Sequence, residues 1–229
     1  DPIPVVPTAH YMMGGIPTNY MGQVVVPEGA SKEAIVPGLF AAGECAAGMH
    51  GANRLGGNSL SDLIVFGKLS GQGAKRYIEK LSGSPTPNPD QIRDAIRGAT
   101  DVLNRESGEN PYVVHDKLQD CMESYVGIVR QADELAQGVE EIGRLKQVAK
   151  GVKAHGSSQY NPGWHEALSL KNMLITSEAV ARAALIREES RGAHTRIDFE
   201  GERDEWLRYN IVSRKGADGE MVTETVERK

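Results

Sequence analysis

The sequence lacks the features that mark several common classes of protein. Its 229 residues include only two cysteines, too few for the disulfide framework of a small secreted domain. The formal net charge of −5 argues against a nucleic-acid-binding protein, because such proteins usually carry a basic face. No run of about eighteen apolar residues occurs, so no segment is expected to span a membrane.

Several short signatures of targeting and catalysis are also missing. The first residues, Asp1-Pro2-Ile3-Pro4, have neither the basic start nor the apolar core of a signal peptide. The sequence contains no GxGxxG dinucleotide motif, no phosphate-binding P-loop and no GxSxG motif. The histidines and cysteines show no metal-ligand spacing, so we expect no zinc site. Cys45 and Cys121 are expected to be reduced and mostly buried, which fits the cytoplasm best.

A turn-rich segment divides the chain. Residues 82–88 are dominated by Ser, Gly, Pro and Asn and predict a linker. Upstream of it glycines are dense, and short apolar runs predict strands at Gln23–Val26 and Leu39–Ala42. A helical pattern then runs from Ser59 to about residue 81, with Ser59 as the predicted N-cap and Asp62 near the positive end of the helix.

Nearly everything after the linker is predicted to be helical. Apolar residues recur at helical spacing in the segments 90–105, 111–126, 131–152 and 164–187. The short polar joints between these segments favour an antiparallel helical bundle. Residues 216–229 are polar without a clear period, so this end is expected to be irregular and mobile. The predicted fold class is therefore α/β plus α: a glycine-rich α/β portion, a helical bundle domain and an irregular tail.

Two side chains are candidates for binding an anionic ligand. Arg54 lies between Gly51 and Gly56-Gly57, where side-chain bulk is smallest, so a planar ligand can approach and the guanidinium fork can bind a carboxylate. The alternative is a surface arginine on a flexible loop. His10 precedes Gly14-Gly15, a flexible backbone segment, and its imidazole can donate to a carboxylate oxygen. The alternative for His10 is an ordinary loop histidine.

Glu44 and the start of the helix are candidates for binding a cofactor. Glu44 follows the second predicted strand, and carboxylates at such strand ends commonly bind ligand hydroxyls. A solvated loop glutamate is the alternative. The helix start at Asn58, Ser59 and Leu60 offers free N–H groups and a positive dipole end, which suit an electron-rich carbonyl or a reduced flavin ring.

A dense charged turn, Arg187–Arg196, follows the last predicted helix. It is either a solvated helix end, a hinge of ion pairs that docks the helices onto the first part of the chain, or a contact to another subunit.

Together these segments closely resemble the flavoprotein subunit of succinate dehydrogenase and fumarate reductase. The similarity covers about residues 1 to 206, and the block around Arg54 is long and specific. The segments that carry the resemblance are His10-Tyr11 with Gly14-Gly15, Gly38–Glu44, His50–Leu60 and Glu189–His194.

The resemblance implies a role for each candidate. His10 and Arg54 would hold the two ends of succinate or fumarate against the flavin. Glu44 would bind FAD, and the helix start at Asn58–Leu60 would contact the flavin ring. The family transfers a hydride between the dicarboxylate and flavin N5, and an arginine moves the proton. Electrons then pass to an iron–sulfur subunit, and from there to quinone at membrane anchor subunits, which implies a cytoplasmic location, peripheral on the inner face of the plasma membrane.

The resemblance also implies that much of the machinery lies upstream of Asp1: the dinucleotide glycine motif, the histidine that carries covalent flavin, and the proton-shuttling arginine. No catalytic residue is expected in this chain, and the fragment alone is expected to be inactive. Residues 1–82 would be the C-terminal portion of the FAD-binding Rossmann-like domain with the end of the capping region. Residues 88–197 would form the helical domain and 198–229 the tail. The first part is expected to expose a cofactor face and to associate or be locally disordered.

Two alternatives remain open. The helical region is also interpretable as an assembly module that docks the iron–sulfur subunit. A related flavoprotein such as L-aspartate oxidase is disfavoured, because an amino-acid substrate needs a partner for its ammonium group. Gly38–Lys68 supplies only Glu44 and Asp62 for that purpose, and neither is expected to be free.

Overall fold

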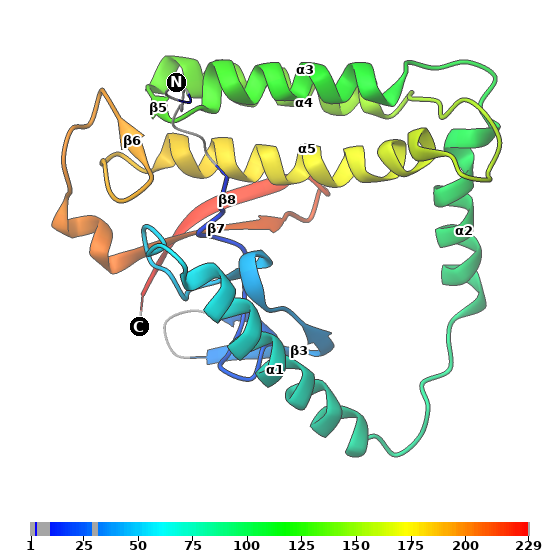
Figure 1. The fold of residues 1–229 in the computed structure, drawn as a ribbon, viewed down its shortest axis with the longest axis horizontal. Helices are drawn as coiled ribbons and strands as arrows, with labels where there is room; N and C mark the ends of the chain where they lie inside the picture. The colour runs from blue at the N-terminus through cyan, green and yellow to red at the C-terminus, as the bar shows by residue number, and fades with distance from the viewer. Residues whose placement is uncertain (1–2, 4–9, 29–31, 229) are drawn as a thin grey trace.

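The computed structural model describes residues 3, 10–28 and 32–228. Within these residues the chain forms a small α/β part, a helical part and a C-terminal hairpin (Figure 1). The helices are α1 Asn58–Glu79, α2 Pro89–Asn104, α3 Pro111–Val126, α4 Ala132–Ala149 and α5 Pro162–Ile186. The strands are β1 Ile16–Pro17, β2 Gln23–Glu28, β3 Lys32–Phe40, β4 Ala46–Ala47, β5 Val129–Arg130, β6 Thr195–Arg196, β7 Tyr209–Lys215 and β8 Met221–Glu227. None of the described helices is long and apolar enough to cross a membrane.

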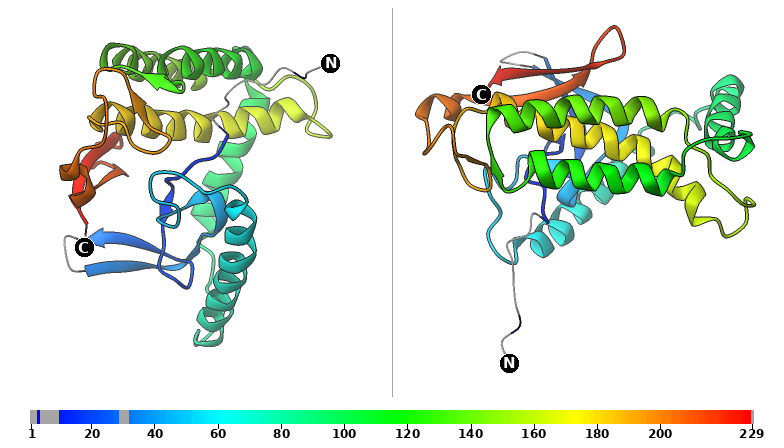
Figure 2. Two further views of the ribbon diagram at one scale, coloured as in Figure 1. Left: turned by 60° about the vertical axis from the view of Figure 1, so that its left-hand side comes forward. Right: turned by 90° about the horizontal axis from the view of Figure 1, so that it is seen from above.

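The α/β part is a hairpin laid against one helix. β2 and β3 pair antiparallel, β1 pairs with β4 in parallel, and α1 packs on the hairpin (Figures 1 and 2). The close approach depends on Gly73 of α1, where an added Cβ would lie 2.6 Å from the Met21 carbonyl oxygen. The strand predicted at Leu39–Ala42 is wrong in its bounds, because β3 runs through Pro37 and the left-handed Gly38 and ends at Phe40. The pairing register of β2 and β3 shifts at a bulge. A bulge can accommodate proline and glycine, which otherwise interrupt a strand.

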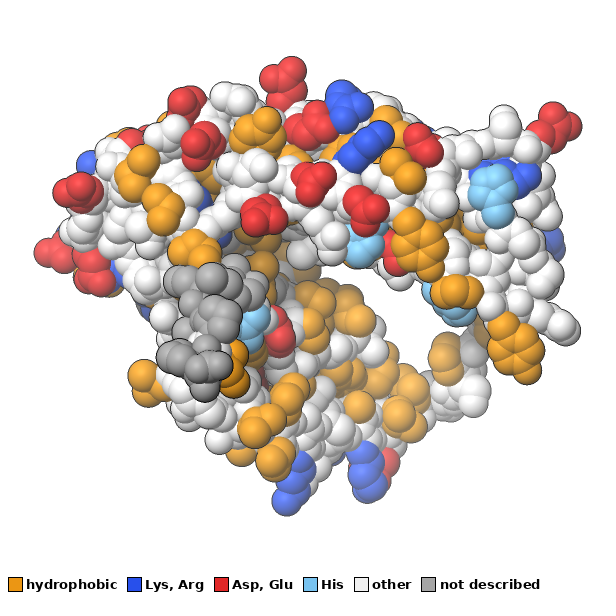
Figure 3. All heavy atoms as spheres, turned by 45° about the horizontal axis from the view of Figure 1, so that its top comes forward, with side chains coloured by type: hydrophobic (Ala, Val, Ile, Leu, Met, Phe, Trp, Pro, Cys, Tyr) orange, Lys and Arg blue, Asp and Glu red, His pale blue; other side chains and the backbone are white. Residues whose placement is uncertain are grey.

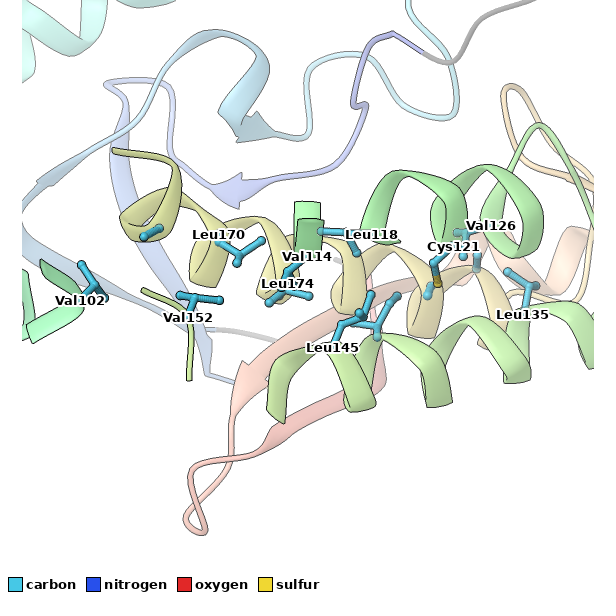
Figure 4. Close-up of a cluster of buried hydrophobic side chains, with 14 of the residues drawn as sticks. Val102, Val114, Leu118, Cys121, Val126, Leu135, Leu145, Val152, Leu170 and Leu174 are labelled. Atoms are coloured by element: carbon cyan, nitrogen blue, oxygen red, sulfur yellow. The ribbon is translucent and has the colours of Figure 1, made fainter. Parts of the chain in front are cut away.

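The helical core is formed by α3, α4 and α5. Their inward-facing side chains point toward one another in Figure 4, and Leu135, Ile142, Leu145 and Leu170 are fully buried. The five predicted helical segments are confirmed, with bounds within a few residues of those expected. α2, α3 and α5 each begin with Asn-Pro, and the side chains of Asn88, Asn110 and Asn161 accept hydrogen bonds from the first-turn N–H groups. The Asn-Pro starts combine an N-cap with a proline at N1, where its missing N–H costs nothing.

The expectation that all four helices after the linker form one bundle is wrong for α2. α2 stands apart from the other three in Figure 1, with Val102 as its buried side chain and Ile92 and Ile96 exposed. The C-terminal end of α2 does join the bundle: Val102 packs in its core, and Trp164 Nε1 donates to the Ala99 carbonyl at 2.7 Å. An amphipathic period shows that a helix has an apolar face but does not say what covers it.

The expectation of an irregular tail is also wrong. β7 and β8 pair antiparallel over seven residues each and lie against α5. Asp218-Gly219 turns the chain, with Gly219 in the left-handed region at φ 88°, and such an Asp-Gly pair is a turn signal. Cross-strand pairs stabilise the hairpin: Ser213 Oγ lies 3.0 Å from Thr223 Oγ1, and Arg214 donates to Glu224 at 2.9 Å.

The charged turn Arg187–Arg196 is not a solvated helix end, because its key charges are buried. Glu189 is fully buried and accepts hydrogen bonds from Arg187 and Arg191. Burial raises the pKa of Glu189, but these bonds and the backbone N–H of Arg203 outweigh it and hold the pKa below its ordinary value. Arg196 is also buried. The charges therefore form an internal cluster rather than a surface patch.

This turn docks the helical part onto the first part of the chain, one of the roles considered for it. The Ala193 N–H donates to the Ala52 carbonyl at 3.2 Å. Gly192 has φ 61°, and a Cβ added there would lie 2.3 Å from the Ala52 carbonyl oxygen. Only glycine fits, both because of its left-handed backbone and because of the contact.

Hydrophobic side chains gather on the surface of the α/β part in Figure 3, whereas charged side chains cover the bundle. On α1, Leu60 and Ile64 are 66% and 73% exposed. Exposed apolar patches of this kind mark contact surfaces. Cys45 is exposed too, contrary to expectation, whereas Cys121 is buried, and both are free.

Replacing Gly192 with alanine is expected to weaken the docking of the two parts. Gly201→Ala is a matched control, since Gly201 also has a left-handed backbone at φ 78° but an added Cβ there meets nothing within 4 Å. The control is expected to cost roughly 1 to 2 kcal/mol for the backbone conformation, and Gly192→Ala at least about 1 to 3 kcal/mol more for the collision. Urea denaturation and proteolysis of the segment around Ala52 measure both effects. Equal losses in the two variants would contradict the docking.

Replacing Asp198 with asparagine is expected to remove a pH-dependent part of the stability. Hydrogen bonds from Arg196 lower the pKa of Asp198 from 3.8 to about 2. A carboxylate whose pKa is depressed by folding stabilises the folded state above its unfolded pKa and loses that contribution as the pH falls through the folded pKa. The free energy of unfolding of the native protein should therefore fall between about pH 4 and pH 2, by up to about 2 kcal/mol from this group. The free energy of unfolding of the Asp198→Asn variant should fall less over the same pH range. Asp94→Asn, on exposed α2, controls for the loss of a surface charge; an equal decline in Asp198→Asn and the native protein would refute the assignment.

Candidate functional site

Two loops from distant parts of the sequence meet at the candidate site. The histidine loop, residues 10–15, precedes β1, and the arginine loop, residues 48–57, joins β4 to α1. His10 Nε2 lies 3.4 Å from Arg54 Nη2, although 44 residues separate the two in sequence. The two side chains predicted to bind a dicarboxylate are therefore neighbours.

The guanidinium of Arg54 has donor capacity that the described part of the chain leaves unused. Nη1 donates to the Leu55 carbonyl at 3.3 Å. Nε is buried and has no acceptor among the described residues. A buried donor without an acceptor is costly. Nη1 and Nη2 each carry two N–H groups and have one partner among the described residues, so each keeps a donor for an oxyanion.

The glycines of the arginine loop leave its surroundings open. A Cβ added at Gly51, Gly56 or Gly57 would meet nothing within 4 Å among the described residues. Gly57 is left-handed at φ 81° and caps α1. The prediction of Ser59 as the N-cap is therefore wrong: the glycine turn carries the chain directly into the helix at Asn58, and no side chain caps it.

Beneath Arg54 lies a group of side chains that sequence reasoning missed. The Arg54 guanidinium carbon is 4.5 Å from the centre of the Tyr11 ring, a cation–π geometry. The Tyr11 hydroxyl donates to Asp62 Oδ2 at 3.4 Å, and His50 Nε2 lies 3.2 Å from the same oxygen. Burial, and then the carboxylates of Asp62 and Glu44, raise the pKa of Tyr11 and keep its hydroxyl protonated. We name Tyr11, His50 and Asp62 the tyrosine triad.

The triad has weak signals in the sequence. Tyr11 follows His10 directly, His50 belongs to the conspicuous block around Arg54, and Asp62 is predicted only as a charge at the helix start. Nothing in their spacing indicates that the three meet, because the contact depends on the tertiary fold.

Glu44 connects the two loops rather than standing alone. It lies in the short 3₁₀ helix Gly43–Cys45 and is exposed, and its Oε1 accepts a hydrogen bond from the Met12 N–H at 2.9 Å. The carboxylate predicted to bind FAD thus also holds the histidine loop. Asn58 and Leu60 are exposed and Ser59 is half-buried in the first turn of α1, so these residues directly follow the arginine loop.

Other features of the described chain do not compete with this site. No group of three metal-ligating side chains occurs among the described residues. A shallow groove of about 470 Å³ between α3 and α5 is lined by residues of those two helices, His115 and Met122 among them, and by none from the two loops.

Comparison with known proteins agrees with the resemblance. Residues 115–229 match the family model described as fumarate reductase flavoprotein C-term, and residues 1–60 match that of a FAD binding domain. The succinate dehydrogenase flavoprotein subunit of Coxiella burnetii is 40% identical over 94% of this chain and 37% of its own length. The fumarate reductase flavoprotein subunit of Escherichia coli is 37% identical over 96% of this chain and 36% of its own length.

Solved structures show the same similarity. The Mycobacterium smegmatis Sdh1 complex in the apo form superposes with a TM-score of 0.84 at 43% identity, over 96% of this chain and 36% of that one. The quinol fumarate reductase FrdA of E. coli gives a TM-score of 0.82 at 32% identity, over all of this chain and 38% of that one. The chain thus spans a little over a third of the length of these relatives. It belongs to the family of FAD-binding flavoprotein subunits that includes those of succinate dehydrogenase and fumarate reductase.

Proposed function

We propose that the chain is part of the flavoprotein subunit of a succinate:quinone oxidoreductase, which interconverts succinate and fumarate with FAD. The observation that carries the proposal is the contact between His10 and Arg54, whose terminal nitrogens keep unused donors. In this contact His10 Nε2, 3.4 Å away, accepts from Arg54 Nη2, which leaves Nδ1 of the imidazole as a donor. A permanent cation beside such a donor suits a dianionic dicarboxylate.

In this proposal His10 and Arg54 bind and orient the substrate. Arg54 neutralises carboxylate charge and fixes the molecule, which brings the reacting carbon to a defined position. It is not assigned the proton transfer, because its guanidinium is engaged in binding the substrate. The residue that transfers the proton is not assigned to this chain.

The residues around the arginine loop fit FAD in their chemistry. FAD, when bound, accepts or supplies the hydride. Glu44 offers an exposed carboxylate to ribose hydroxyls. Asn58, Ser59 and Leu60 form the positive dipole end of α1, which would stabilise negative charge on a reduced ring. The N–H groups of Asn58 and Leu60 are not free as predicted, because they donate to the carbonyls of Leu55 and Gly57 at 3.1 and 3.2 Å. The open glycines of the arginine loop admit a planar group close to the backbone.

The proposal extends to the partners that such a flavoprotein requires. Electrons would pass to an iron–sulfur subunit, then on to quinone at membrane anchors, which would hold the flavoprotein on the inner face of the plasma membrane. Docking of the iron–sulfur subunit by the helical region stays a prediction. Within the charged turn Arg187–Arg196, Gly192 and Ala193 contact Ala52 of the same chain, so this part of the turn is not open to a partner.

An amino-acid oxidase is a weaker alternative. Its substrate needs a carboxylate partner for the ammonium group. Asp62 is buried and engaged with His50 and Tyr11, and Glu44 is assigned to FAD in this proposal. No other acidic side chain of residues 38–68 is available for that role.

Arg54→Ala in the complete flavoprotein subunit, loaded with FAD, is expected to lower kcat/KM for succinate about 100-fold or more. The variant removes a charged hydrogen-bonding partner and leaves the substrate's charge unmatched. Steady-state kinetics with an artificial dye measure the loss, and flavin absorbance checks that FAD is retained. Arg93→Ala, an exposed arginine on α2, is the control. Unchanged succinate kinetics in Arg54→Ala would refute the proposed function.

The 229-residue chain alone is expected to show no dye reduction by succinate when FAD is added, because it has no dinucleotide glycine motif and no assigned proton-transferring residue. Dye absorbance after addition of succinate measures turnover, and a flavin titration with and without succinate measures FAD binding. Tight FAD binding that succinate perturbs and Arg54→Ala abolishes would show instead that the chain holds a working half-site.

A further inference from the structure

We propose that the tyrosine triad is a positioning group that holds the Arg54 guanidinium in its substrate-binding orientation and so sets the affinity for a dicarboxylate. The inference rests on the proposed function, because it assumes that Arg54 binds the substrate. The members of the triad do not contact Arg54 through hydrogen bonds; they act through the Tyr11 ring beneath it.

The arginine loop alone does not fix the guanidinium. Its glycines give the backbone freedom, and the side chain of Arg54 has one weak intraloop bond, to the Leu55 carbonyl at 3.3 Å. The Tyr11 ring, 4.5 Å from the guanidinium carbon, is the extended surface against which the group lies. A cation over an aromatic face is attracted to it, and the flat guanidinium can stack there.

The Tyr11 ring is in turn anchored at its far end. Its hydroxyl makes a long hydrogen bond to Asp62 at 3.4 Å, and its ring meets that of His50 edge-on, with centroids 5.6 Å apart and planes at 77°. Three segments thus fix one ring: the histidine loop, the arginine loop and α1.

Asp62 explains why this arrangement has a preferred geometry. The residue is 7% exposed, and a carboxylate so buried needs partners. His50 and Tyr11 supply them through the same oxygen, Oδ2. Arg54 lies over the face of the Tyr11 ring and Asp62 lies at its hydroxyl, so charge and hydrogen bonding together favour one orientation of the ring.

The test uses the complete flavoprotein subunit with FAD bound. Tyr11→Leu removes the ring and is expected to raise KM for succinate, and Kd for the non-reacting dicarboxylate malonate, by about 3- to 30-fold. The change in kcat should be smaller, and the FAD content unchanged. Tyr11→Phe keeps the ring but loses the hydroxyl anchor, so it should recover most of the affinity. Tyr20→Leu, an exposed tyrosine in the same part of the chain, is the control.

A double-mutant cycle separates this inference from the proposed function. In an Arg54→Ala background, Tyr11→Leu should cause no further loss of malonate affinity, because the ring has nothing left to position. An additive loss would overturn the inference. So would a Tyr11→Leu variant whose KM is unchanged, or one whose kcat and FAD content fall while KM stays constant.

Two further outcomes are distinguishable. If Arg54→Ala itself keeps normal malonate binding, the proposed function fails whatever Tyr11 does. If Tyr11→Leu does not fold, the variants Tyr11→Phe and Asp62→Asn test the inference in its place. Both should raise the malonate Kd by about 2- to 5-fold through a less firmly held ring, and an unchanged Kd in both would overturn the inference.

Discussion

The structure depends on a buried cluster of charges at the end of α5, because this cluster gives the helical part a rigid edge with which to hold the α/β part. Arg196 donates to the carbonyls of Ala184, Leu185 and Arg187, the acceptors that the end of a helix leaves unpaired. The same guanidinium binds Asp198 through two bonds of 2.8 Å. An arginine can satisfy five acceptors in one plane, so a single side chain ends the helix and orders the turn beyond it.

The ordered turn at the end of α5 is connected to the candidate site through the backbone of one residue. The turn places Gly192 and Ala193 against the carbonyl of Ala52, two residues before Arg54. A loop rich in glycine gains conformational entropy on unfolding, and fixing it needs contacts from outside. The helical domain supplies such a contact, and its packed core of α3, α4 and α5 keeps the turn in place. The proposed binding residues of the α/β part therefore depend on packing in the helical part.

The sequence predicted features that depend on local pattern, and it missed those that depend on distant contacts. The five helices follow from their apolar period, and His10 and Arg54 follow from their glycine-rich surroundings and the family resemblance. The position of α2 and the meeting of Tyr11 with Asp62 could not be predicted, since neither leaves a local pattern. The hairpin β7–β8 was predictable in part. Asp218-Gly219 is a turn signal, but polar residues in both strands interrupt the apolar alternation by which a strand is recognised.

Arg54 is thus supported from two directions by different physical means. From one side the backbone of its loop is held at Ala52 by a rigid turn, and from the other its guanidinium lies on the Tyr11 ring above a buried carboxylate. The first contact fixes the backbone from which the Arg54 side chain extends, and the second fixes the position of its guanidinium. The proposed binding role of Arg54 needs both, because an anchored backbone still leaves a long side chain several rotamers. The glycines that leave room for the proposed ligand would otherwise make the arginine mobile, and the two contacts reconcile access with order.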